Sequence, residues 1–445
     1  TGEALDAAWN HGKRPGLLQG ESLEDGTVRL EPVHDRIATL YPRQRGRDLI
    51  DFYAELELAF YQALDARARQ MGFRVPVVPT MPWGRVSLME LYQDWPMTDA
   101  HLKWDKGEGR HVIRNVSALA EPTHQELILQ TVHAAQGKAF AVSELNHVFP
   151  NRYMAEAVLL WASVALVQDW DVLLWNSFPI GDETEDASWM DGPGDHRNAT
   201  VKLAQNMTAS SLFRGAWLSA AEGFYPVHHT HEEAMSQAVY GKAHKPLVVR
   251  EIDVLLSHRI RRTFGDAPPE ARAGEPVAGI GWWQDPGLLV LDLPQVQARV
   301  GPPVEIAEVG GDGAGPREPS RLRVELEQWA AVSLAAVDGE SLEDCSQALL
   351  TIGTRQENSG MAWAEDYRFA RAFGVPPVLI QPARGRIAFQ WSQGRPTVET
   401  LGTDGGVTGA LRVRRVSRGW WGIELDEKVQ TPLLLVSSAE ASRGG

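Results

Sequence analysis

Apolar positions recur at helical spacing in three stretches of the chain. Over residues 48–71 they fall three and four residues apart, and Gly72 follows where such a helix would end. A second helix is predicted over residues 121–137 and a third over residues 153–168. The third stretch is apolar almost throughout, interrupted by Glu156, which is typical of a helix buried on every side.

Short apolar runs suited to buried parallel strands alternate with these helices. They cover residues 74–80, 97–104, 139–144 and 171–178. Strand followed by helix at this pace predicts parallel βα units, and each run ends in polar or aromatic residues. In a (β/α)8 barrel the carboxyl ends of the strands carry the active site.

Four such units make only half of a closed barrel, which needs eight. Residues 1–47 are too few to hold four more units, because a whole barrel takes about 250 residues. We therefore predict that residues 1–215 form the C-terminal half of a (β/α)8 TIM barrel, its strands five to eight.

After residue 215 the pattern changes to short apolar runs separated by glycine and proline. Examples are GLLVLDLP, ALLTIG, VPPVLIQP, GRIAFQW, ALRVRRV and TPLLLVSS. Short strands at such spacing predict an antiparallel sandwich or an open barrel. Residues 216–445 are therefore expected to form an accessory β-sandwich-like domain, which makes the fold class α/β plus all-β.

Composition narrows the class of protein. A chain of 445 residues exceeds what a single core holds, so two or three domains are expected. The net charge of −15 argues against a nucleic acid or an anionic membrane as partner, because either would need a basic face. No apolar run reaches the length of a membrane span, and the single cysteine, Cys345, rules out an internal disulfide.

Glu144 ends the third predicted strand, in the segment AFAVSELNHVFP. A carboxylate at the end of a buried strand must be paired or hydrogen-bonded, so its presence calls for a reason. Glycoside hydrolysis supplies one, because two carboxyl groups flank the bond and in retaining enzymes one of them attacks the anomeric carbon. The alternative is an acid placed near the start of the helix that Pro150 and Tyr153 introduce.

The arrangement VSELNHVFPN followed by QDWDVLLWNSF resembles strands seven and eight of the clan A glycoside hydrolases, (β/α)8 retaining enzymes that include family 5 cellulases and mannanases. The resemblance implies that Glu144 is the nucleophile and that Trp175 is the aromatic platform under the sugar. TDAHLKW resembles the strand-six segment, which implies that His101 lies near the nucleophile. Leu102 stands where relatives often carry a tyrosine-type residue.

Further substrate-binding residues are expected around these positions. Asn146 and His147 would shape the sugar subsite, and Trp83 and Trp104 would line the cleft, although tryptophan serves equally well as core filling. In the clan, the general acid/base is a glutamate after an asparagine at the end of strand four. No Asn-Glu pair precedes strand five here, so this partner is expected upstream of the chain, which does not begin with Met, and the chain alone is expected to be inactive.

Two function classes stay open on these grounds. The leading one is a retaining glycoside hydrolase that cleaves O-glycosidic bonds in a β-linked poly- or oligosaccharide and needs no cofactor. The other is a non-catalytic carbohydrate-binding or structural protein on a barrel-derived scaffold. Substrate identity and oligomeric state are not indicated; a polysaccharide substrate would fit a secreted or periplasmic protein, and a cytoplasmic location stays open.

His228, His229 and His231, in VHHTHEE, form the candidate metal cluster of the sequence. Neutral imidazoles suit zinc. Two adjacent histidines on one element cannot both point inward, however, so a solvated loop is the default and no metal site is predicted.

Overall fold

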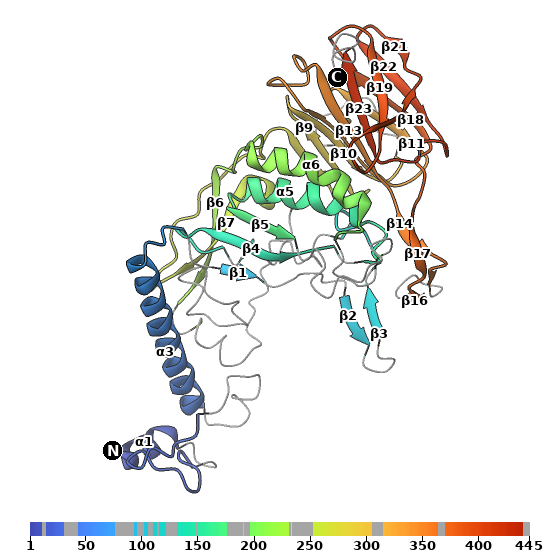
Figure 1. The fold of residues 1–445 in the computed structure, drawn as a ribbon. Helices are drawn as coiled ribbons and strands as arrows, with labels where there is room; N and C mark the ends of the chain where they lie inside the picture. The colour runs from blue at the N-terminus through green and yellow to red at the C-terminus, as the bar shows by residue number, and fades with distance from the viewer. Residues whose placement is uncertain are drawn as a thin grey trace.

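The computed structural model describes residues 1–10, 15–30, 43–75, 93–95, 102–105, 110–113, 115–121, 131–132, 134–147, 149–175, 190, 196–230, 233, 252–304, 315–363 and 370–438. Within this part, helices and small groups of parallel strands are joined to a large antiparallel β region (Figure 1). The described strands do not close into a barrel, whereas the expected all-β portion is present.

The parallel strands of the described residues fall into two groups. The three-stranded sheet has the order β1-β4-β5 and consists of β1 (Gln93–Trp95), β4 (Phe140–Leu145) and β5 (Val172–Trp175). The second group pairs β6 (Gly223–His229) with β7 (His258–Phe264). A parallel bridge between Ala135 and Arg262 connects β7 to the segment that leads into β4.

The described helices differ greatly in burial. They are α1 (Gly2–Trp9), α3 (Arg43–Gln70), α5 (Ala157–Val167), α6 (Thr200–Arg214) and α8 (Ile252–Ser257), with the short 3-10 helix η3 (Met154–Glu156) directly before α5. Every side chain of α5 except Leu166 is buried, as its apolar sequence predicts. Figure 1 shows α5 and α6 side by side between the β4–β5 strands and the large antiparallel sheet.

Most of the apolar stripe of α3 stays at the surface, although Leu49 near the start of the helix is buried. Phe52, Leu56, Phe60 and Leu64 are between 43% and 57% exposed. The first turns of the helix pack instead against α1, where Trp9 Nε1 donates a hydrogen bond to Asp48 Oδ2 at 2.7 Å. Helical periodicity therefore located this helix correctly, but beyond Leu49 the apolar residues that mark its face are exposed in the described structure.

Two sheets form the C-terminal β region. The eight-stranded sheet has the order β20-β19-β23-β13-β12-β10-β9-β8 and comprises β8 (Ile280–Trp283), β9 (Leu288–Asp292), β10 (Val296–Gly301), β12 (Ala330–Ala336), β13 (Gln347–Gly353), β19 (Pro396–Leu401), β20 (Val407–Leu411) and β23 (Leu433–Ser438). The four-stranded sheet has the order β11-β18-β22-β21 and comprises β11 (Leu322–Leu326), β18 (Gly385–Gln390), β21 (Arg414–Ser417) and β22 (Trp420–Leu425).

Three two-stranded antiparallel ribbons complete the described strands. They pair β2 (Leu102–Asp105) with β3 (Arg110–Ile113), β14 (Gln356–Ser359) with β17 (Val375–Ile380), and β15 (Ala362–Trp363) with β16 (Ala370–Ala372). In Figure 1 the β14–β17 ribbon descends from the antiparallel sheets toward the ends of β4 and β5.

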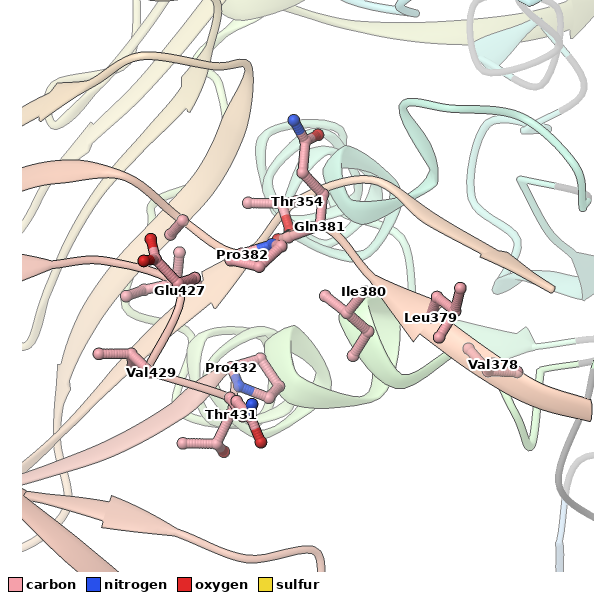
Figure 2. Close-up of a pocket in the computed structure, with 13 residues that line it drawn as sticks. Thr354, Val378, Leu379, Ile380, Gln381, Pro382, Glu427, Val429, Thr431 and Pro432 are labelled. Atoms are coloured by element: carbon pink, nitrogen blue, oxygen red, sulfur yellow. Dashed lines mark hydrogen bonds between the residues drawn. The ribbon is translucent and has the colours of Figure 1, made fainter. Parts of the chain in front are cut away.

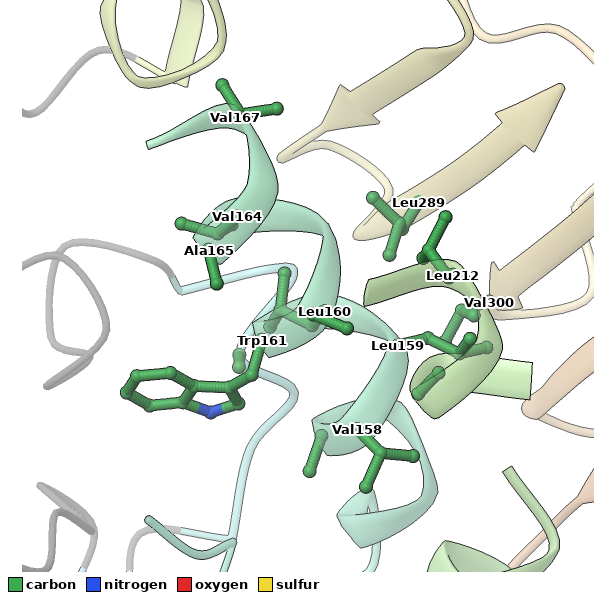
Figure 3. Close-up of a cluster of buried hydrophobic side chains, with 14 of the residues drawn as sticks. Val158, Leu159, Leu160, Trp161, Val164, Ala165, Val167, Leu212, Leu289 and Val300 are labelled. Carbon is green, nitrogen blue, oxygen red and sulfur yellow. The ribbon is translucent and has the colours of Figure 1, made fainter. Parts of the chain in front are cut away.

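The eight-stranded sheet separates two hydrophobic cores, and β12 shows how. Alternate residues of a strand point to opposite faces: Val332 and Leu334 belong to the core shared with the four-stranded sheet, whereas Ala331 and Ala335 belong to the core shared with α5 and α6. Figure 3 shows the second core, in which Leu159 of α5 lies with Leu212 of α6 and with Val300 of β10.

The expectation for residues 97–104 needs correction. This run was predicted to be a parallel strand of the barrel, but its described part, β2, pairs antiparallel with β3, and β1 is the parallel neighbour of β4. The sequence KGEG that separates β2 from β3 offers a reason, because glycines between two short strand-forming runs favour a hairpin. Most of the predicted strand over residues 74–80 lies outside the described residues.

Candidate functional site

The backbone of β4 is irregular at Glu144. Val142 is paired with Leu173 of β5, but the next pair along the ladder is Leu145 with Trp175. Ser143 and Glu144 therefore face the single residue Leu174, which is the arrangement of a β-bulge. Bulges bend a strand and re-aim its side chains, and they are frequent beside active sites. The side-chain position of Glu144 lies outside the described part of the structure.

A buried cation stands directly behind the end of β4. Lys202, in the first turn of α6, is fully buried, and its Nζ donates hydrogen bonds to Asn146 Oδ1 at 2.5 Å and to the carbonyl oxygen of His147 at 3.0 Å. Asn146 is itself fully buried and His147 is 3% exposed. Because a buried ammonium needs such acceptors, the lysine fixes the backbone that leaves β4.

An aromatic pair lies at the end of the neighbouring strand. The half-buried indole of Trp175, the last residue of β5, stacks on the His196 ring with centroids 5.3 Å apart and planes 10° apart. His196 Nε2 lies 3.0 Å from Asn206 Nδ2 of α6. Burial, and then the charge of Lys202, lowers the pKa of His196 to about 3, so its imidazole is neutral near pH 7.

Within the described part of the chain, Glu156 places a buried carboxyl group close to His147. Its Oε1 lies 3.9 Å from His147 Nδ1 and accepts a hydrogen bond from the backbone N–H of Ala118, while Oε2 lies 2.6 Å from Ser117 Oγ. Complete burial raises the pKa of Glu156 to about 8 despite these two hydrogen bonds. At neutral pH this residue is therefore mainly a protonated acid that anchors residues 117–118.

The structure brings together only part of the predicted site. Asn146, His147 and Trp175 gather where β4 and β5 end. His101 and Trp83 lie outside the described residues. Trp104 has a described backbone in β2, opposite His111 of β3, but its side chain lies outside the described part.

Three residues of this region were missed by sequence reasoning: Glu156, His196 and Lys202. Glu156 carries a signal, because a single acid in a helix that is apolar on all sides must be buried. Lys202 and His196 carry none that is comparable, because their burial depends on contacts with β4 and β5 that spacing along the chain does not specify. The hydrogen bond from Lys202 to Asn146, for example, spans 56 positions of sequence.

The described cavities lie elsewhere. One, with a volume of about 360 Å³, lies beside the C-terminal β region, where Ile380 of β17 faces Pro432 and Thr431 at the entry to β23 (Figure 2). Its lining is mostly apolar, and Glu427 is its one ionisable side chain. Another cavity, of about 670 Å³, lies before the amino ends of β4 and β5, lined by Lys138, Asp171 and Arg261 among others. Neither contains the residues at the carboxyl ends of these strands.

The candidate histidine cluster does not form a metal centre in the described residues. His229 is buried in β6, and His228 Nδ1 lies 3.1 Å from Thr263 Oγ1 of β7. His231 lies outside the described part, and the described residues contain no group of three or more potential ligands placed to hold a metal ion. Among the described helices, none combines the length and the apolar character needed to cross a membrane.

Comparison with known proteins adds no relative from which a role could be transferred. No family model, no curated protein and no solved structure matches this chain.

Proposed function

We propose that this chain carries the nucleophile of a retaining glycoside hydrolase that acts on a β-linked poly- or oligosaccharide, with Glu144 as that nucleophile. The observation that carries the proposal is the β-bulge at Ser143–Glu144. It lies two residues before Asn146, whose side chain contacts Lys202. The bulge is the kind of backbone irregularity that aims a functional side chain out of a regular ladder.

Electrostatics support the same assignment. A nucleophilic carboxylate must be ionised, and a nearby cation favours ionisation. The buried ammonium of Lys202 is hydrogen-bonded to Asn146, which stands two residues after Glu144 in the sequence. In the proposed reaction the carboxylate attacks the anomeric carbon, the leaving oxygen takes a proton from a second carboxylic acid, and water later releases the sugar.

Trp175 is the proposed sugar platform. One face of its half-buried indole carries His196, which holds the ring in a fixed plane. The opposite face would stack against the apolar face of a sugar ring. Asn146 and His147, both buried where β4 ends, are proposed to shape the subsite indirectly, by holding the backbone there through Lys202.

Glu156 is not the proposed acid/base. Its carboxyl group is completely buried and is bound to Ser117 and to the backbone of Ala118, so it has no path to a substrate. The resemblance to clan A hydrolases gives the acid/base role to the glutamate of an Asn-Glu pair at the end of strand four, and we assign this role to no residue here. The finer fold that accompanies this proposal is the second half of a (β/α)8 barrel, with β4 and β5 as its strands seven and eight.

A covalent trapping experiment tests the nucleophile without requiring the acid/base. A 2-deoxy-2-fluoro-β-glycoside with a dinitrophenolate leaving group needs no proton donor, so a nucleophile alone can displace it. We expect mass spectrometry of the digested protein to show a glycosyl adduct on the peptide that contains Glu144, with glucosyl and mannosyl reagents as the first panel.

Matched variants make the result specific. Glu144→Gln should abolish the adduct and leave the melting temperature unchanged, whereas Glu275→Gln, at an exposed loop position, should label like the wild type. Labelling that survives Glu144→Gln would exclude Glu144 as the nucleophile. Sugar binding measured by calorimetry with no adduct from any reagent would favour a non-catalytic carbohydrate-binding protein.

A further inference from the structure

The β14–β17 ribbon reaches from the C-terminal β region to the connection between β5 and α6. The side chain of Asn358, 2% exposed, forms two hydrogen bonds with the backbone of Met190: Nδ2 donates to the carbonyl oxygen at 2.8 Å, and Oδ1 accepts from the N–H at 2.9 Å. A side-chain amide that engages both polar groups of one residue fixes that residue in position and orientation.

Gln356, on the same strand, completes the start of α6. Ala199, at the N-cap position, has no side chain able to cap the helix. Gln356 Oε1 accepts a hydrogen bond from the N–H of Val201 at 3.1 Å, and its Nε2 donates to the carbonyl oxygen of Asn198 at 2.6 Å. A residue 155 positions away thus satisfies an N–H group that a local cap would normally satisfy.

Both attachments border the candidate site. Val201 is followed immediately by Lys202, the buried cation behind β4, and His196 lies between Met190 and Asn198. A further contact links Phe373, two residues before β17, to the segment after β4: the Phe149 and Phe373 rings have centroids 6.0 Å apart. The ribbon therefore holds the segment that follows β5 through the buried amides of Gln356 and Asn358, and the chain beside it reaches the segment that follows β4.

We propose that Gln356 and Asn358 are positioning residues of the candidate site, which hold the β5–α6 connection so that Lys202 and His196 stay against the ends of β4 and β5. The C-terminal β region then helps to position the residues of the sugar-binding site. This inference rests on the function proposed above.

The test compares Gln356→Ala and Asn358→Ala with Gln297→Ala. Gln297 is an equally buried amide of the same β region, and its three hydrogen bonds, to Asp292, Leu293 and Arg321, lie away from the site. The variants are compared in the full chain at equal global stability, adjusted with urea.

We expect hydrogen exchange of the Met190 and Val201 amides to accelerate tenfold or more in the two ribbon variants and to stay unchanged in the control. The His196 pKa, read from its ring proton resonances, should rise toward its ordinary value, and the second-order rate of Glu144 labelling by the fluoroglycoside should fall at least tenfold. Gln297→Ala should change neither the His196 resonance nor the labelling rate.

The outcomes separate the two proposals. If the wild type is labelled but the ribbon variants keep its labelling rate and its His196 pKa, the positioning role is overturned while the proposed function stands. If no sugar reagent binds or labels the wild type, the proposed function falls, and the positioning role in a sugar site falls with it.

Discussion

Lys202 Nζ lies 2.5 Å from Oδ1 of Asn146, so a buried ammonium is tied to the strand end that carries the candidate nucleophile. The bond joins two elements that the chain reaches at very different points, α6 and β4. Its removal should therefore be visible both in stability and in the electrostatics of the site.

Lys202→Met should lower the free energy of unfolding by about 1–3 kcal/mol, because Asn146 Oδ1 and the carbonyl oxygen of His147 would lose a buried donor. It should also raise the pKa of His196, which the lysine charge now helps to lower. Urea denaturation and NMR titration of the His196 ring measure the two effects. Lys138→Met, at an exposed lysine, is the control and should change neither.

Because Glu156 is buried, we expect the protein to lose stability as the pH rises. Its pKa of about 8 in the folded protein lies above the ordinary value of 4.5, so the folded state holds a proton that the unfolded state releases. The corresponding stability is present below about pH 4.5 and is lost as the pH rises to 8. Glu156→Gln mimics the protonated acid and should flatten the melting temperature over this window. A variant curve parallel to that of the wild type would contradict the protonated state.

For His196 we expect the opposite dependence of stability on pH. Its pKa of about 3 lies below the ordinary value of 6.5, so its contribution to stability is present above about pH 6.5 and is lost as the pH falls toward 3. His196→Phe retains a ring for Trp175 to stack on and removes the titrating group. The variant should therefore lose less stability than the wild type between pH 6 and pH 4, two values inside that window. Denaturant midpoints at these two pH values test this expectation, and an unchanged difference between them would show that His196 is charged in the folded protein.

The buried hydroxyl of Ser333 joins α6 to the eight-stranded sheet, so we expect its removal to destabilise the protein. Its buried Oγ lies within 3.1 Å of three polar atoms: Gln205 Oε1 and Thr208 Oγ1 on α6, and Thr351 Oγ1 on β13. Ser333→Ala would leave buried groups short of a partner and should cost about 1–3 kcal/mol of unfolding free energy. Ser417→Ala, on the exposed strand β21, should have an effect near zero in the same denaturation experiment. Equal effects would mean that the network contributes little.

The local pattern of apolar residues was enough to predict the elements that are buried because of their own apolar character. The largely apolar stretch of 153–168 became η3 and α5, and the run GLLVLDLP became β9, because a segment this apolar has to be buried whatever it packs against. The Glu144 segment was likewise predicted as a strand, and it lies in β4.

The rest depends on contacts between distant segments. The apolar stripe of α3 has the right period, but periodicity does not say which element will cover it. The roles of Gln356 and Asn358 arise from hydrogen bonds to residues about 155 to 168 positions earlier, and no local pattern distinguishes these amides from the solvated amides of an ordinary strand. The bulge at Glu144 is also invisible in sequence, because it is defined by the register with β5.

The position of the eight-stranded sheet between two cores has a consequence for how the protein melts. Consecutive residues of β12 contribute to different cores, so β12 cannot detach from one core without disturbing the other. Neither half then has an independent route to unfolding, and a calorimeter should record a single heat-absorption peak for the regions on both sides of the sheet. The two regions that share the eight-stranded sheet would then melt together, although the sequence pattern changes between them.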